Sequence, residues 1–165
     1  MIAEMEKGIV AKLAAKLPDI KVEEFPDDPK NYRLTHPHGA VLVAYGGGRR
    51  KNPDVLAGTS QERRIEYQLT IKTRSLRSHT GAYAILEGIE TALSGEPIEG
   101  ARFYCILDRF EDVSSGVWTY LAVYAADIPW VSQAQFPDDV ALALAAAKIT
   151  ATGGLEGDPP ITVGE

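Results

Sequence analysis

Cysteine is nearly absent from this sequence. Cys105 is the single cysteine among 165 residues, so no disulfide can form within one chain. A zinc site made of cysteines from one chain is excluded for the same reason. Apolar runs are short and interrupted by charged residues, so we expect no transmembrane helix. Glu4, Glu6, Lys7 and Lys12 stand where a signal peptide would be apolar, and we expect the protein to stay in the cytoplasm.

Residues with catalytic potential are few and scattered. His36 and His38 could share a metal from one side of a strand, but the third histidine, His79, lies far along the chain. Cys105 has apolar neighbours rather than the electropositive surroundings of a reactive thiol, and we expect it in the core. The glycines at 46–48 lack the following Lys-Ser/Thr and helix of a phosphate-binding loop.

An acidic cluster of Asp108, Glu111 and Asp112 stands at the hairpin expected between residues 103–110 and 117–126. Paired carboxylates can hold Mg²⁺ or perform acid–base catalysis. Carboxylates are also usual at turns, where water solvates them, and we interpret the cluster in this way. Because no set of residues predicts catalysis, we expect no enzyme, no metal site and no cofactor.

Charge is unevenly distributed along the chain, which has a net charge of −6. Residues 49–77 hold eight Lys or Arg against three Asp or Glu, whereas residues 81–165 hold three against thirteen. This separation favours head-to-tail contact between copies, although a solvated surface explains it equally well. The candidate interaction residues are Arg49, Arg50, Lys51, Arg63, Arg64, Arg74 and Arg77, with Asp108, Glu111 and Asp112 as the acidic counter-patch. The acidic total and the lack of aromatic residues between the cations make nucleic acid a weaker candidate than a protein partner.

Two amphipathic helices are expected. The first repeats apolar residues every three or four positions over residues 2–17. The second repeats them over residues 82–93 and begins after an N-cap at Ser78 or Thr80.

Five strands are expected, over residues 20–25, 38–45, 63–73, 103–110 and 117–126. The apolar run at 40–44 indicates a central strand that is covered on both faces. The strict alternation over 63–73 indicates a sheet with one buried and one polar face. Residues 46–60, between these two strands, are expected to form a long basic loop. Pro129 is expected to close the last strand.

The order of these elements predicts an α+β fold with a mostly antiparallel sheet of about four to five strands. Two helices pack on one face of that sheet, and a long basic loop and a C-terminal arm complete the chain. Residues 1–131 are expected to form the domain, and residues 132–165 an extension or arm that does not join the core.

The segments that carry a family resemblance appear in a fixed order: Gly39–Gly46, Arg63–Tyr67 leading into Leu69–Ile71, Gly81–Glu87, and Trp118–Tyr120 with Ile128-Pro129. With the first helix and the 20–25 strand, they resemble the Mu-like phage tail-region protein family, whose members look like tail terminators. The resemblance covers roughly residues 1–131.

This resemblance implies a structural role without bond chemistry. Tail terminators form a hexameric ring on the last ring of the tail tube, stop its growth and present a surface for head joining. The implied partners are further copies of the chain, the tail tube, and sheath or neck proteins, in the virion tail and in the host cytoplasm during assembly. Three alternatives stay open: a head–tail connector or neck protein, a nucleic-acid-binding accessory protein, and a hydrolase or nuclease that uses the acidic cluster.

The expected basic loop motivates one hypothesis about joining. We expect this loop to become ordered when it meets tube, sheath or neck proteins. A variant without residues 48–59 should then fold but fail to join tails.

Overall fold

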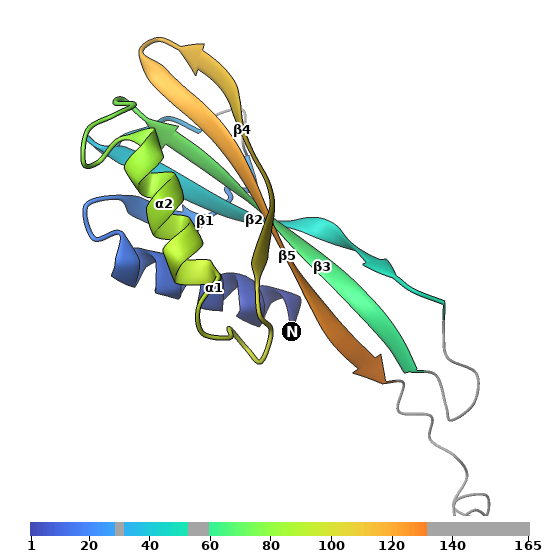
Figure 1. Ribbon diagram of the computed structural model, residues 1–165. Coiled ribbons are helices and arrows are strands. Elements are labelled where there is room, and N and C mark those ends of the chain that lie inside the picture. Colours follow the sequence, from blue (N-terminus) through green and yellow to red (C-terminus); the bar gives the residue numbers. More distant parts are fainter. Residues whose placement is uncertain (29–31, 53–59, 132–165) are drawn as a thin grey trace, which may run out of the picture. The chain divides into compact units, whose positions relative to one another are not determined.

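The structure is a computed structural model that describes residues 1–28, 32–52 and 60–131. Within these ranges two helices and five strands follow one another in the expected order (Figure 1). Their bounds are α1 (Ile2–Lys16), β1 (Lys21–Glu24), β2 (Gly39–Arg50), β3 (Ser60–Thr73), α2 (Ala82–Leu93), β4 (Tyr104–Ser114) and β5 (Val117–Val131). The predicted α+β fold is confirmed. Residues 1–131 form one compact unit, and the expected C-terminal arm lies outside the described residues.

One five-stranded sheet in the order β1-β2-β3-β5-β4 organises this unit. All neighbouring strands are antiparallel except β1 and β2, which are parallel and joined by a long connection. Both helices lie on the same face of the sheet, with α1 against β1 and β2 and α2 against β3, β4 and β5 (Figure 1). The sheet is therefore mostly antiparallel with its helices on one side, as the sequence predicts.

The core lies between the helices and this face of the sheet. Met5, Ile9 and Leu13 of α1 are buried, as their spacing of four predicts. Every second residue of β3, from Ile65 to Ile71, is buried on the face of the sheet that the helices cover. Burial of each such Leu or Ile side chain stabilises the fold by roughly 2 kcal/mol.

Strand β2 is covered on both faces, as its continuous apolar run predicts. Leu42 faces away from the helices and is still only 1% exposed. Tyr32, from the connection before β2, donates a hydrogen bond of 3.2 Å to Glu23, the β1 residue that pairs with Leu42. Farther along, the Arg74 guanidinium donates to the Leu34 carbonyl at 3.3 Å. The connection therefore shields the second face of β2.

The sequence predicts a loop over residues 46–60, and this prediction is wrong for the first part of that range. Residues 46–50 belong to β2, and Gly48, Arg49 and Arg50 pair with the start of β3. The strand shifts register between Tyr45 and Gly47, and Gly47 has φ +132°, which L side chains rarely adopt. The glycines therefore form a bulge inside a strand. Residues 53–59 lie outside the described residues.

Three further expectations need correction in the last two strands. β4 continues to Ser114, so the connection to β5 is the two-residue turn Ser115-Gly116, with φ of 51° and 74°. β5 continues through Pro129 because its pairing with β4 ends at Ala125, and a proline can lie where one side of a strand has no ladder partner. Cys105 is exposed and not in the core, because β4 is an edge strand.

Across the described part of the chain, neither helix has the length and apolar character that a membrane crossing requires.

Candidate interaction surfaces

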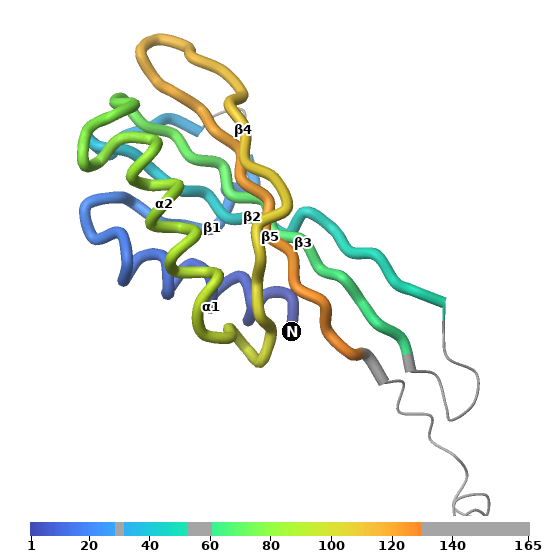
Figure 2. The backbone as a smooth tube through the Cα atoms, in the orientation of Figure 1, coloured from blue at the N-terminus to red at the C-terminus, as the bar shows by residue number. Residues whose placement is uncertain are grey.

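Strands β2, β3 and β5 extend together beyond the helices, and we call this extension the basic finger (residues 46–51, 60–64 and 127–131). Figure 2 shows the three strands running side by side away from both helices. None of the finger side chains that the structure describes is buried. Its cations are Arg49, Arg50, Lys51, Arg63 and Arg64, and its described carboxylates are Glu62 and Asp127. The finger is therefore an exposed, positively charged extension of the sheet.

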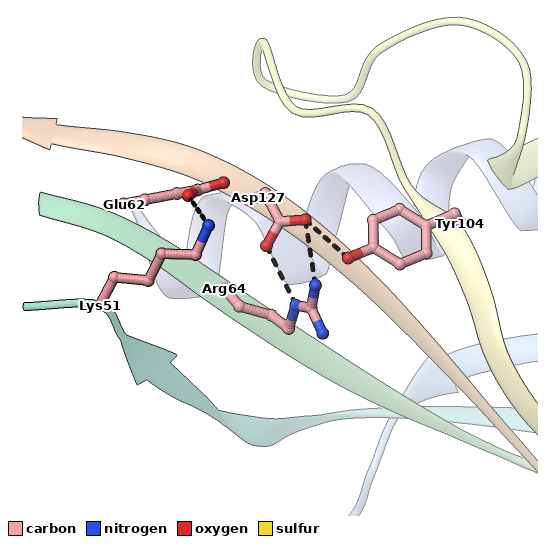
Figure 3. Close-up of polar contacts among 5 residues, drawn as sticks. All are labelled: Lys51, Glu62, Arg64, Tyr104 and Asp127. Carbon is pink, nitrogen blue, oxygen red and sulfur yellow. Dashed lines mark hydrogen bonds and ion pairs between the residues drawn. The ribbon is translucent and has the colours of Figure 1, made fainter.

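A polar network on the face opposite the helices joins the finger to the edge strand (Figure 3). The Arg64 guanidinium donates two hydrogen bonds to the Asp127 carboxylate, of 3.0 Å from Nε and 3.4 Å from Nη2. The Tyr104 hydroxyl donates to the same carboxylate at 2.7 Å. The Arg64 guanidinium carbon also lies 5.8 Å from the centre of the Tyr104 ring, within cation–π range. One arginine thus connects β3, β4 and β5.

The network shifts the pKa values of the ionisable groups that form it. The hydrogen bonds from Arg64, and next the one from Tyr104, lower the pKa of Asp127. The same contact with Asp127 raises the pKa of Tyr104 and of Arg64. All three groups are exposed, so solvent screens these interactions and they contribute little to stability. Their main effect is to hold the Arg64 side chain in one place.

Two more finger cations contact partners within the chain. Lys51 forms an ion pair with Glu62, and the Lys51 amide donates to the Glu62 carbonyl at 3.0 Å. On the helix side of the finger, Arg63 donates to the Tyr45 hydroxyl at 3.0 Å. A hollow of about 220 Å³ on the finger is lined by Arg49, Arg50, Lys51, Glu62, Arg64 and Asp127.

The structure separates the predicted basic residues into two groups. Arg63 and Arg64 lie near the start of β3 with the finger, whereas Arg74 and Arg77 follow the end of β3 at the opposite end of the sheet. Arg74 is held by the Leu34 carbonyl. These seven residues therefore do not form one surface.

The predicted acidic residues lie on the exposed edge strand β4. Asp108 and Asp112 pair with Ala122 and Thr119 of β5, and Glu111 occupies the bulge between Phe110 and Asp112. Glu111 also accepts a hydrogen bond of 2.6 Å from Arg109. No three His, Cys, Asp or Glu side chains within residues 1–28, 32–52 and 60–131 are grouped so that they could hold a metal ion.

Apolar side chains gather beside this acidic strand, and we name Tyr83, Phe110, Val113, Trp118 and Tyr120 the hairpin patch. Phe110 contacts Trp118 and Tyr120, with ring centres 6.1 Å and 5.6 Å apart. Val113 pairs with Trp118 across the hairpin, and Tyr83 of α2 interacts with Tyr120. Tyr83, Phe110 and Val113 are 44%, 48% and 47% exposed. The patch is therefore an apolar surface that the described part of the chain leaves largely open.

Sequence reasoning found part of these surfaces. Its strand period of two puts Trp118, Tyr120 and Tyr124 on one face, and in the structure all three face the helix side of β5, with Tyr124 buried. It missed Asp127 and Tyr104, which contact Arg64 only because β5 lies between β3 and β4. It also missed Phe110, since nothing in the sequence shows that β4 forms the edge.

Comparison with known proteins places this fold in a family. None of the curated proteins matches the chain. A chain in the solved structure of the virion of a native gene transfer agent (GTA) particle is similar, with a TM-score of 0.49 and 14% sequence identity. The alignment covers 79% of this chain and 95% of that chain. The family model described as Gp37 protein matches residues 9–147, which include all five strands and continue past residue 131. The chain therefore belongs to the Gp37 protein family.

Proposed function

We propose that the protein is a structural tail-assembly protein of a phage or prophage, a tail terminator that caps the tail tube as a ring and prepares it for head joining. The resemblance of residues 1–131 to Mu-like tail-region proteins supports this role. The proposed site of action is the virion tail, and assembly takes place in the host cytoplasm.

The observation that carries the proposal is the presence of two different surfaces at opposite ends of one sheet. The basic finger lies where β3 begins, and the acidic β4 strand with the hairpin patch reaches the end where β3 finishes. A ring of identical subunits needs two different, complementary patches on each subunit. The basic finger and the acidic β4 strand are two patches of opposite charge on one sheet, which supports the proposal.

Electron microscopy of particles made with and without this protein tests the proposal. Overlong tails in its absence are the expected result, because a terminator stops tube growth. Tails of normal length that lack heads would support the closest alternative, a head–tail connector or neck protein. Normal tails with heads attached would contradict both roles.

Nucleic-acid binding is a weaker alternative for the finger. Arg64 and Lys51 are paired with Asp127 and Glu62, which offsets part of the charge that phosphates would need to meet. Tight DNA binding by the purified protein that weakens steeply with salt would favour this alternative.

Metal-dependent turnover that is lost in Asp108→Ala would favour the hydrolase or nuclease alternative.

A further inference from the structure

The hairpin patch has the chemistry of a protein-binding surface. Aromatic side chains such as Phe110, Trp118 and Tyr120 are the usual anchors of protein interfaces, where they occupy the centre of the contact. Three members of the patch are more than two-fifths exposed. Asp108 and Glu111 stand beside Phe110 on the same strand. The patch therefore combines an apolar centre with a negative rim.

Backbone pairing at the β4 edge is the less suitable way to bind a partner. Bulges at Ile106 and Glu111 interrupt the strand, and its middle carries three carboxylates and Arg109. Bulges and charged side chains are devices that prevent edge-to-edge strand addition. A partner is consequently expected to contact the side chains of the patch and its rim, not the open ladder.

The basic finger has the complementary chemistry. Its five cations exceed its two described carboxylates by three, and four of the five are arginines. A guanidinium can stack on an aromatic ring and pair with a carboxylate at the same time. The hairpin patch offers both groups within one strand. The glycines at 46–48 add little side-chain bulk, which allows close approach.

The finger cannot reach the patch of its own chain. Trp118 and Ile128 lie ten residues apart on the continuous strand β5, a separation of roughly 33 Å at the usual rise per residue. Figure 1 shows the β4–β5 hairpin and the finger at opposite ends of the sheet. Contact between the two surfaces therefore requires two molecules.

We propose that the basic finger of one copy docks on the hairpin patch of the next copy, so that subunits associate head to tail. The finger's guanidinium groups cover Phe110, Trp118 and Tyr120 and pair with Asp108 and Glu111, the carboxylates that stand beside Phe110. This contact is heterologous and generates a ring if the rotation closes. It rests on the proposed function in that it supplies the ring that a terminator needs.

Cross-linking with two engineered cysteines tests this contact in the full-length protein. Cys105→Ala removes the native thiol, Gln61→Cys places one thiol on the finger, and Ser114→Cys places another beside the patch. A bifunctional maleimide should then join purified molecules into a ladder of dimers, trimers and larger species on a denaturing gel. The control keeps Gln61→Cys but moves the second thiol to α1 with Lys7→Cys, and we expect no species larger than a dimer.

Two sets of changes to the patch show whether the ladder depends on the proposed chemistry. Phe110→Ser removes the central aromatic anchor, and Asp108→Lys with Glu111→Lys reverses the charge of the rim. Each should reduce trimers and larger species at least about tenfold, because loss of an interface hot spot weakens binding by that factor or more. All these side chains are exposed, and unchanged circular dichroism and urea midpoints will show that the variants still fold.

The outcomes separate this contact from the terminator role. A missing ladder, or one that neither set of changes reduces, would overturn the proposed contact. If the ladder forms as expected while tails lacking the protein keep their normal length, the contact stands and the terminator role fails. Overlong tails combined with a missing ladder would mean that the terminator role stands and the proposed contact fails.

Discussion

Tyr67 is the largest side chain that the core encloses completely. Its ring makes edge contacts with Tyr45 and Phe103, with ring centres 5.6 Å and 5.9 Å apart. Its hydroxyl donates a 2.8 Å hydrogen bond to the carbonyl of Ile2 in the first turn of α1. Burial raises the pKa of this tyrosine to about 12, so the hydroxyl keeps its proton and remains a donor even in mildly alkaline solution. One side chain thus ties the start of the helix to the middle of the sheet.

Tyr67→Phe should lower the free energy of unfolding by about 1 kcal/mol, because it removes one hydrogen bond in the interior and keeps the packing of the ring. Urea denaturation at neutral pH measures the change. Tyr83→Phe is the matched control, because it also deletes a tyrosine hydroxyl with a hydrogen bond, here to Tyr120, but at an exposed position on α2, and it should lower the midpoint less than Tyr67→Phe. Equal midpoints for wild type and Tyr67→Phe would show that water replaces the lost bond.

Asp127 is the residue whose charge state should affect stability at low pH. Its pKa is lowered in the folded state by Arg64 and then by Tyr104, so its contribution is fully present above the ordinary carboxyl pKa of about 4. This contribution is lost as the pH falls through the lowered folded-state value. Asp127→Asn should therefore be slightly less stable than wild type at pH 7, and this small difference should shrink at acidic pH.

Urea midpoints measured across the pH range for both proteins check this expectation. In an Arg64→Gln background, the principal cause of the shift is gone, and Asp127→Asn should have a smaller effect. The same effect in both backgrounds would show that Arg64 does not stabilise the Asp127 carboxylate.

The β4–β5 hairpin is the element that carries both the acidic rim and most of the apolar patch. Its two-residue turn needs positive φ at both Ser115 and Gly116, which matches the right-handed twist of the flanking strands. Gly116 has φ 74° and no atom within 4 Å of the position that a Cβ would take. The backbone conformation, and not a steric contact, therefore makes glycine favourable there.

Gly116→Ala should destabilise the protein by roughly 1 kcal/mol, the cost of holding a side chain in the left-handed region. Thermal unfolding gives the change. Gly95→Ala is the matched control, because Gly95 has no positive φ and its nearest neighbour, the Thr91 carbonyl, lies 3.6 Å from the added carbon. A larger loss in Gly95→Ala than in Gly116→Ala would contradict this account of the turn.

At the scale of the whole molecule, the described core is complete before residue 131. Every buried residue of the hydrophobic core lies between Met5 and Ala126, and residues 1–131 form one compact unit. A chain that ends after Val131 should therefore fold, with an unfolding midpoint close to that of the full chain. Circular dichroism and urea denaturation of both proteins test this, and a truncated chain that unfolds at much lower urea would show that residues 132–165 support the core.

The sequence by itself determined the elements and the fold class. Apolar spacing of three and four positions defined α1 and α2, and the alternation over residues 63–73 defined β3, because these periods follow directly from backbone geometry. The continuous apolar run at 40–44 correctly indicated a strand covered on both faces. Local signals failed at the glycines 46–48 and at Pro129. Glycine and proline usually end a strand, but a strand tolerates glycines at a bulge and a proline where one of its sides has no neighbouring strand.

Tertiary structure alone decided which strand became an edge and which charges met. Cys105 stands in the apolar stretch 103–107, which looks like core, and only the order β1-β2-β3-β5-β4 exposes it. The contact between Arg64 and Asp127 joins residues 63 positions apart, and no local pattern encodes their register. Helical and strand periods are properties of neighbouring residues, whereas sheet order and surface complementarity arise from packing between distant segments.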